Sequence, residues 1–285
     1  MALGSYDHTR DITDGSVPVQ GIELRTLNMS IEEMFYRFTL YREWDVSEMS
    51  TGKFVSICAE ERPNVRAIPV FISRAFRNSM FYVKSGSPVR RPEDLSGKRI
   101  GVPEWAQSAG IYGRGYLSDY VNVDLKSIDW VQAGVNEPGR MEKVKLHLPE
   151  GLRYTSMPTK CLNDMLLAGD LDAIMTARPP KAFGQGIVRL MPDYQALEEQ
   201  YFRDTQIYPI MHALVIKQSV LDDHPWVAMN LYKAFCIAKE QSVDRLSDVS
   251  ASHAPLAWLG EYAIRMRGLF GEDFFPYGIG QNAGG

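Results

Sequence analysis

The chain has little of several features that would at once assign it to a class of protein. It holds only three cysteines, which are far apart and odd in number: Cys58, Cys161 and Cys236. That spacing excludes a disulfide framework and fits no metal-ligand motif, so reduced thiols are expected. No apolar run approaches the roughly 20 residues that a membrane span needs, and the N-terminal stretch MALGSYDHTRDITDG lacks the apolar core of a secretory signal. We therefore expect a cytoplasmic protein with no membrane partner.

The chain also lacks an excess of positive charge. Its 285 residues include 31 lysines and arginines against 35 aspartates and glutamates, a net charge of -4, and the pI is near 5.8. This balance does not predict nucleic acid as a partner. What the chain does contain is a large share of apolar residues. Hydrophobic residues make up 45% of the chain, which is enough for one large domain or two smaller ones.

Segments with a strand pattern alternate with segments of helical spacing. Strands are expected at residues 21–27, 44–50, 67–71, 80–84, 98–102, 128–134, 171–177 and 208–217. Helices are expected at residues 30–41, 51–61, 161–168, 225–242 and 255–268, and from Ser108 onward. Ser30 and Glu33 form a capping-box pattern at the start of the first of these helices. The alternation predicts an α/β fold with mainly parallel sheets.

Polar side chains follow many of the predicted strands. In open α/β sheets, ligands bind at the carboxyl ends of the strands, so these residues indicate a binding site. They are Ser50, Arg74, Arg77, Glu104, Arg140 and Arg178.

One of the predicted strands, YPIMHALVIK, contains a titratable group in an apolar run. His212 is open to two interpretations. It could be a packed histidine with a single hydrogen bond, or it could be a proton donor at a ligand site, since imidazole titrates near neutral pH.

The chain resembles a known family over most of its length. PEDLSGKRIGVPEW is similar to the start of the second lobe in type II periplasmic-binding-protein folds. A more specific resemblance is to the 4,5-dihydroxyphthalate decarboxylases, and it extends from about Gly4 to Tyr277. The segments that carry it, in order along the chain, are DVSEMS, AIPVFISRAFR, IGVPEW, NEPGR, TARPPKAF, YPIMHALVIK and HPWVAMNLYKAF.

The resemblance implies a two-lobed α/β architecture and an activity. The first lobe would comprise residues 1–84 plus 207–285, the second lobe residues 85–206, and the ligand cleft would lie between them. His212 would then line the cleft. The implied reaction converts 4,5-dihydroxyphthalate to 3,4-dihydroxybenzoate and carbon dioxide by protonation of the ring. It requires no organic cofactor, because the substrate's own hydroxyls supply the electron density.

Such a reaction assigns roles to the candidate residues. His212 would be the proton donor. Glu104 or Asp7 would accept the phenolic proton, and the other of the two could orient His212. The cations for the two carboxylates would be arginines, whose planar forks suit carboxylate. The binding candidates are Arg74, Arg77, Arg140 and Arg178, with Ser50 beside them and Trp105 as a wall for the ring.

Structural alternatives stand beside these roles. Arg74 and Arg77 could pair with Glu60 or Glu61, Arg140 with Glu137, and Trp105 could belong to the core. Asp7 could bind backbone amides at a helix start. A metal site from Asp7, His8, Glu48 and His212 would have to form by folding alone, since the sequence has no metal-binding motif. We expect no metal.

Two other functions fit the same fold: a solute-binding protein for an aromatic acid, and a lyase or dehydratase acting on a different acid. The missing signal sequence favours an enzyme over an exported receptor. A homo-oligomer is an open alternative. Apolar residues of the C-terminal helices could form a subunit contact or complete the first lobe's core, and they are Leu231, Phe235, Leu259 and Phe270. The tail GIGQNAGG is expected to be loosely attached.

Overall fold

The computed structural model describes residues 1–59, 63–251 and 253–283. The chain divides into two compact units, each with its own sheet. Unit 1 comprises Met1–Phe54, Cys58–Arg74 and Thr205–Gly285, and unit 2 comprises Val55–Ile57 and Ala75–Asp204. The first unit is therefore assembled from both ends of the chain.

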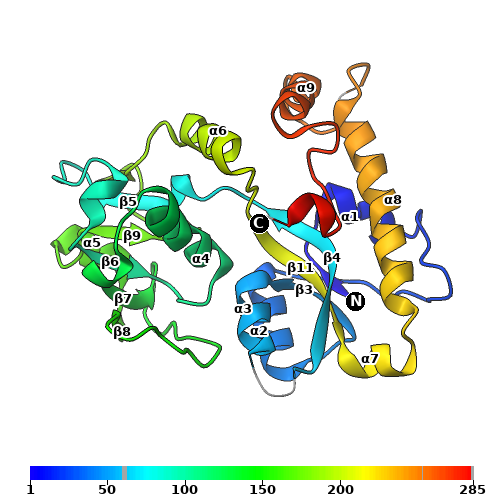
Figure 1. Ribbon diagram of the computed structural model, residues 1–285, viewed down its shortest axis with the longest axis horizontal. Helices are drawn as coiled ribbons and strands as arrows, with labels where there is room; N and C mark the ends of the chain where they lie inside the picture. The colour runs from blue at the N-terminus through cyan, green and yellow to red at the C-terminus, as the bar shows by residue number, and fades with distance from the viewer. Residues whose placement is uncertain (60–62, 252, 284–285) are drawn as a thin grey trace. The chain divides into compact units, whose positions relative to one another are not determined.

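Unit 1 contains a five-stranded sheet in the order β2-β1-β3-β11-β4 (Figure 1). Its strands are β1 (Ala2–Leu3), β2 (Leu27–Asn28), β3 (Val46–Ser50), β4 (Val65–Arg74) and β11 (Ile210–Lys217). The strand β1 runs parallel to β2 and β3, whereas β11 is antiparallel to both of its neighbours, β3 and β4. Every residue of β3 is buried, so polar side chains on this strand lie in the interior.

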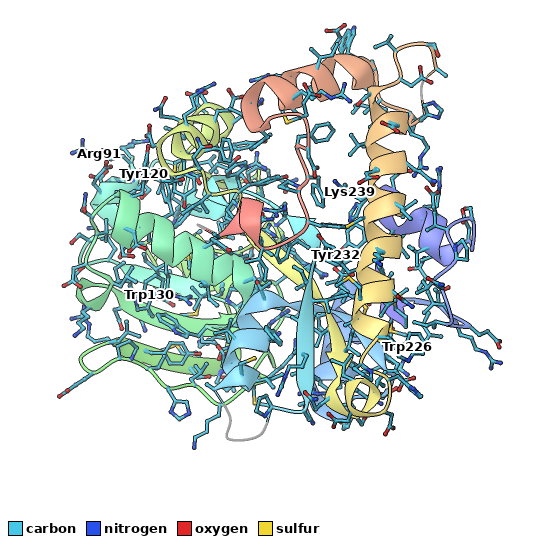
Figure 2. All side chains as sticks on the ribbon, turned by 45° about the vertical axis from the view of Figure 1, so that its right-hand side comes forward. Arg91, Tyr120, Trp130, Trp226, Tyr232 and Lys239 are labelled. Atoms are coloured by element: carbon cyan, nitrogen blue, oxygen red, sulfur yellow. The ribbon has the colours of Figure 1, made fainter. Side chains whose placement is uncertain are left out.

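Helices cover the sheet of unit 1. They are α1 (Asp7–Thr13), α2 (Ile31–Tyr41), α3 (Thr51–Cys58), α7 (Gln218–Asp223), α8 (Val227–Ser247) and α9 (Leu259–Phe270). Ser30 caps α2, because its hydroxyl accepts the Glu33 amide. The long helix α8 lies against α1 and β4 (Figure 1), and Trp226, Tyr232 and Lys239 mark its course in Figure 2.

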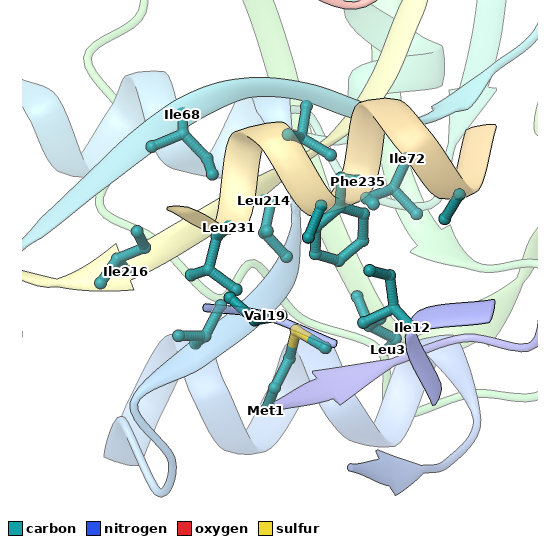
Figure 3. Packing of buried hydrophobic residues seen from close by; sticks show 14 of the residues in the cluster. Met1, Leu3, Ile12, Val19, Ile68, Ile72, Leu214, Ile216, Leu231 and Phe235 are labelled. Atoms are coloured by element: carbon teal, nitrogen blue, oxygen red, sulfur yellow. The ribbon is translucent and has the colours of Figure 1, made fainter. Parts of the chain in front are cut away.

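The apolar core of unit 1 lies between α8 and the sheet. Leu231 and Phe235 of α8 pack with Ile72 of β4 and Leu214 of β11 (Figure 3). Leu231 and Phe235 are fully buried, so these two residues complete the core and are not available for a subunit contact. Phe270 stacks on Tyr208.

Unit 2 contains a six-stranded sheet in the order β10-β5-β9-β6-β7-β8. Its strands are β5 (Phe81–Lys84), β6 (Arg99–Val102), β7 (Asp129–Gly134), β8 (Arg153–Cys161), β9 (Ala173–Met175) and β10 (Ile187–Arg189). Its α-helices are α4 (Ser108–Gly115), α5 (Leu162–Ala168) and α6 (Tyr194–Thr205). Short helical turns η1 (Asn78–Met80), η2 (Pro92–Leu95), η3 (Tyr116–Tyr120) and η4 (Leu125–Ser127) connect them. Trp130 of β7, labelled in Figure 2, is fully buried.

The α/β class predicted from the sequence is confirmed, but the sheets are mixed instead of mainly parallel. The strands β5 and β11 run antiparallel to their neighbours. The strand β11 follows α6 of unit 2, so no strand–helix–strand crossover within one sheet fixes its direction.

Three local expectations differ from the structure. The strand expected at residues 21–27 is reduced to Leu27–Asn28. The strand β5, which the sequence places in the first lobe, pairs with β9 and β10 of the second sheet. The tail is held in place up to Ala283: η5 (Gly280–Asn282) is a helical turn, and the Asn282 amide donates to the carbonyl of Gly278 at 2.8 Å.

Candidate functional site

His212 lies on β11, between β3 and the edge strand β4 of the unit 1 sheet. It is opposite Ser50 of β3 on one side and Ser73 of β4 on the other. The pairing of β11 with β4 is irregular on both sides of His212, and irregularities of this kind re-aim side chains beside functional sites. The side chain of His212 is 16% exposed. Its ring meets that of Phe35 edge-on, with the two ring centres 4.8 Å apart.

A buried carboxylate holds the His212 ring. Nδ1 of His212 lies 2.6 Å from Oε1 of Glu48, whose side chain is fully buried. A carboxylate only accepts, so Nδ1 carries the proton of this bond and the ring orientation is fixed. Among the described residues, none forms a hydrogen bond with the other nitrogen, Nε2. The geometry is that of an imidazole held at one nitrogen and available at the other.

Two further donors meet Glu48. The hydroxyl of Tyr6 donates to Oε1 at 2.7 Å, and the amide of Gly4 donates to Oε2 at 2.9 Å. Burial, followed by the neighbouring charge of Glu48, raises the pKa of Tyr6 well above its ordinary value. The hydroxyl of Tyr6 therefore keeps its proton near neutral pH and donates it to the hydrogen bond with Glu48. Together with His212, these groups compensate the cost of burying Glu48.

His8 lies next to this group but makes a different contact. Its Nε2 donates to the carbonyl of Ile72 at 3.0 Å, and its ring packs against Tyr6 and Phe275. Burial lowers the pKa of His8 to about 4, so the imidazole is neutral near pH 7. Among the described residues, no group of three or more histidines, cysteines, aspartates and glutamates is arranged to hold a metal.

Asp7 does not orient His212. Its carboxylate accepts from Ser242 at 2.6 Å and from Arg245 at 3.1 Å, both on α8. Burial alone would raise the Asp7 pKa, but these bonds and the charge of Arg245 outweigh it, and the pKa lies below its ordinary value. The carboxylate fastens α1 to α8, so the predicted role in orienting His212 is wrong and Glu48 fills it. The sequence could not distinguish the two, because both contacts join distant segments.

Glu104 is the centre of a charged cluster in unit 2. It follows β6 and is fully buried. Arg140 reaches its Oε1 with Nη2 at 2.6 Å and Nε at 2.9 Å, and Nζ of Lys143 lies 3.1 Å from the same oxygen. Glu104 is therefore bound to two cations of its own unit. The alternative pairing of Arg140 with Glu137 is wrong, because Glu137 pairs with Lys181.

Two polar residues, the buried Gln132 and the half-buried Glu142, fix the backbone around this cluster. The side-chain Nε2 of Gln132 donates to the carbonyls of Pro103 and Arg140, at 2.9 Å each. Glu142 accepts from the Trp105 amide and, at 3.0 Å, from the Tyr154 hydroxyl. The segment that carries Arg140 is thus tied to the segment that carries Glu104.

Trp105 packs inside unit 2. The guanidinium of Arg114 lies 3.7 Å from the centre of its ring and donates to its carbonyl at 2.9 Å. The rings of Trp130 and Tyr154 meet Trp105 edge-on. Burial lowers the pKa of Arg114 to about 9. These contacts favour the core interpretation of Trp105 over that of a wall for a ligand ring.

Arg74 connects parts of unit 1 that are distant in the sequence. Its guanidinium is buried and donates to the carbonyl of Tyr208 at 2.8 Å and to that of Pro276 at 2.7 Å, and it also contacts Asn282. It lies over the ring of Phe71. These contacts give Arg74 a structural role, in which it holds the C-terminal segment against β4.

The remaining candidates lie in varied surroundings. Ser50 is buried beside His212. Arg178 is exposed after β9. Arg77 is half-buried near Glu198, and burial lowers its pKa. The alternative partners Glu60 and Glu61 lie outside the described residues.

Sequence reasoning did not name Tyr6 and Lys143, and it considered Glu48 only as a possible metal ligand, not as the partner of His212. Glu48 alternates with Ser50 on a buried strand, which is a detectable signal, since a carboxylate is rarely fully buried without a partner. Lys143 follows Arg140 by three residues in GRMEK, but it lies outside helices and strands, where sequence patterns do not predict contacts.

Comparison with known proteins places the chain in a family. It is 34% identical over 288 residues to a 4,5-dihydroxyphthalate decarboxylase of Comamonas testosteroni, covering 99% of this chain and 87% of that protein. It is 34% identical over 208 residues to a 4,5-dihydroxyphthalate decarboxylase of Pseudomonas putida, covering 71% and 80%. No model of a protein family matches the chain.

Similar solved structures are more distant. A protein from Archaeoglobus fulgidus has a TM-score of 0.49 and 14% identity, covering 93% of this chain and 80% of that one. The periplasmic aliphatic sulphonate binding protein SsuA from Escherichia coli has a TM-score of 0.48 and 9% identity, covering 86% and 76%. In the described part of the chain, no helix is long and apolar enough to cross a membrane. The identity with the curated relatives, sustained over nearly the whole chain, shows that it belongs to the 4,5-dihydroxyphthalate decarboxylase family.

Proposed function

We propose that the chain decarboxylates 4,5-dihydroxyphthalate to 3,4-dihydroxybenzoate, with His212 as the proton donor to the ring. The observation that carries the proposal is the His212–Glu48 pair, with Nδ1 fixed at 2.6 Å and Nε2 available for chemistry. Membership of the family supplies the substrate class. A general acid positioned in this way contributes about 10²–10⁴-fold to rate.

The substrate makes ring protonation feasible. Each of its carboxylate-bearing carbons is para to a hydroxyl. A base, for which Glu104 and Asp7 are the proposed candidates, takes the proton of this hydroxyl, so that electron density moves onto the ring carbon. His212 gives a proton from Nε2 to this carbon, and a new C–H bond forms in a dienone. The bond to the carboxylate then breaks, carbon dioxide leaves, and the electron pair restores the aromatic ring and the phenolic oxygen. The base returns its proton to the phenolic oxygen after carbon dioxide has left. Each turnover therefore consumes one proton, which solvent must return to His212.

The carboxylates of the substrate require cations. The proposed binding residues are Arg77, Arg140 and Arg178. Arg74 is left out, because its guanidinium holds backbone carbonyls of unit 1. Ser50, beside His212, is proposed as a hydrogen-bonding group. Glu48 takes over the orienting role that the sequence assigned to Glu104 or Asp7, and Tyr6 supports Glu48.

Turnover tests the proposal directly. The protein is mixed with 4,5-dihydroxyphthalate, and carbon dioxide and 3,4-dihydroxybenzoate are measured. We expect both products in equal amounts. Tight binding of the diacid without turnover would favour a solute-binding protein, and neither binding nor turnover would favour a different acid as substrate.

A variant tests the role of His212. His212→Gln should lower turnover by about 10²-fold or more while the affinity for the diacid changes little. The control is His224→Gln, which changes an exposed histidine at the end of α7 and should leave turnover unchanged. A His212→Gln protein as active as the unaltered chain would remove this residue from the mechanism.

A further inference from the structure

The helix α9 turns only one side toward the rest of unit 1. Of its 12 residues, all of them described, only Ala263 is buried, and Leu259, Met266 and Phe270 are among those that are half-buried. These four residues recur at a spacing of three or four, so they lie on one face of the helix. In unit 1, α9 contacts α8 (Figure 1). The opposite side of α9 is left for a partner.

Large apolar side chains are exposed on α9 and on the segment before it. Tyr262 is 47% exposed and Ile264 is 52% exposed, and in the preceding segment Leu256 is 52% and Trp258 is 76% exposed. We call these four residues the α9 patch. Single exposed apolar residues are common on soluble proteins, but several that are close together mark a surface for another protein.

Trp258 is the most exposed residue of the α9 patch, and its backbone is unusual. It precedes α9 with φ 60° and ψ 27°, in the left-handed region, which is unfavourable for a residue with a large side chain. Its carbonyl accepts the amide of Tyr262 at 3.0 Å, so the first turn of α9 holds this conformation. Unfavourable backbone conformations concentrate at functional sites, and tryptophan is a frequent anchor of protein interfaces.

Two opposite charges lie on the same side of α9 as Ile264. Glu261, Ile264 and Arg265 are all exposed, and their spacing of three and four residues places them in one stripe. Arg265 has other contacts within the chain, but a guanidinium carries five N–H donors and can bind a further carboxylate. An acid that precedes a base along a helix becomes its own complement when a second copy is turned end for end.

We propose that the α9 patch is the surface through which two copies of this chain form a two-fold dimer, with their α9 helices antiparallel. When the two-fold axis passes at the level of Ala263, residues equally far before and after it face one another. Glu261 of each copy then meets Arg265 of the other copy, and Tyr262 meets Ile264. The two-fold axis repeats every such contact. This inference does not depend on the proposed function.

The size of the contact sets the expected affinity. With 12 residues, α9 is about 18 Å long. Two such helices, with Leu256 and Trp258 beside them, give an interface at the lower end of the roughly 1,200–2,000 Å² that stable complexes bury. We therefore expect a dissociation constant in the micromolar range, with single chains in dilute solution.

Sedimentation velocity at protein concentrations from about 1 to about 200 μM tests the inference. The average mass of the unaltered chain should rise from that of one chain, 32.2 kDa, toward twice this value. Ile264→Asp should stay a single chain, because it places a charge in the apolar part of the interface. The matched control is Ile237→Asp on α8, where the isoleucine is 48% exposed, and it should associate as the unaltered chain does.

Charge reversals test the antiparallel pairing itself. Glu261→Arg and Arg265→Glu each bring like charges together at two symmetric places, so each should weaken association by about 10-fold or more. The double variant Glu261→Arg/Arg265→Glu should associate as the unaltered chain does. An equal mixture of the two single variants should form a mixed dimer. All of these residues are exposed, so each variant should unfold at the same urea concentration as the unaltered chain.

Three results would overturn the inference. The first is an unaltered chain that stays single at every concentration, as it would if another part of the same chain covered the α9 patch. The second is a dimer that Ile264→Asp leaves intact. The third is a double charge variant that associates no better than the single ones, which would contradict the antiparallel pairing. Turnover is not measured in any of them, so failure of the proposed decarboxylation would leave this inference standing.

Discussion

The hydrogen bond between His212 and Glu48 makes the two residues act as one unit. Glu48→Gln keeps the size of the side chain but replaces the carboxylate that holds Nδ1 of His212. We expect turnover to fall by about 10²-fold or more, because the ring loses its fixed tautomer and orientation. The double variant Glu48→Gln/His212→Gln should be about as slow as His212→Gln alone.

This prediction is tested by measuring the turnover numbers of the unaltered chain, the two single variants and the double variant. The free energy of unfolding of each protein, measured in urea, serves as the control, because Glu48 is buried and its loss also affects stability. If the two substitutions lower turnover by independent factors that multiply in the double variant, the residues do not act through one another.

At the level of single residues, the sequence pointed to His212 but not to the carboxylate that holds its ring. His212 is conspicuous as an imidazole in an apolar strand. Its partner lies 164 residues away, and only the pairing of β11 with β3 brings them together. Asp7 shows the converse. From the sequence it was a candidate to orient His212, but its carboxylate accepts a hydrogen bond from Arg245, 238 residues later.

Among the elements, the turn after β7 decides where Arg140 lies. Gly134 ends this strand, and a Cβ atom there would collide with the carbonyl oxygen of Glu137. Gly134→Ala should therefore force the turn to shift, lower the free energy of unfolding by about 1–3 kcal/mol and weaken the binding of phthalate, a diacid that lacks the substrate's hydroxyls, since Arg140 moves with the turn.

The matched control is Gly268→Ala in α9, where the added Cβ has no neighbour within 4 Å. That change should raise the free energy of unfolding by up to about 1 kcal/mol, since alanine favours a helix more than glycine does. Urea unfolding measures both. A Gly134→Ala protein as stable as the unaltered chain would show that the turn adapts without cost.

The sequence predicted elements well where one residue period persists. The strands β3, β5, β6, β7 and β11 and the helices α2 and α8 lie where the patterns place them. The cap of α2 could be predicted because Ser30 and Glu33 lie only three residues apart in the sequence. The directions of β5 and β11 could not be predicted from the sequence, because they depend on which unit each strand joins.

On the scale of the whole molecule, the two units contain buried titratable groups with opposite effects on stability. In unit 1, burial lowers the pKa of His8 to about 4 from an ordinary 6.5. In unit 2, burial raises the pKa of Glu198 to about 7 from an ordinary 4.5, although the Asn78 amide donates to it. The charges near His8 are Glu48 and Asp7. Those near Glu198 are Arg77 and Arg189.

The direction of each effect follows from proton binding. Between pH 4 and 6.5 the unfolded chain binds a proton at His8 that the folded chain does not, so the contribution of His8 to stability is present above pH 6.5 and is lost as pH falls. Between pH 4.5 and 7 the folded chain binds a proton at Glu198 that the unfolded chain does not. Its contribution is therefore present at low pH and is lost as pH rises through 7.

Lowering the pH from 7.5 to 5.5 should therefore affect the two units differently. We expect His8 to lower the melting temperature of unit 1 and Glu198 to raise that of unit 2, by a few degrees each. We expect differential scanning calorimetry to show one melting transition for each unit. His8→Gln should flatten the pH dependence of one transition, and Glu198→Gln should flatten that of the other. Two transitions that shift together, with slopes that neither variant changes, would show that these buried groups do not control the response to pH.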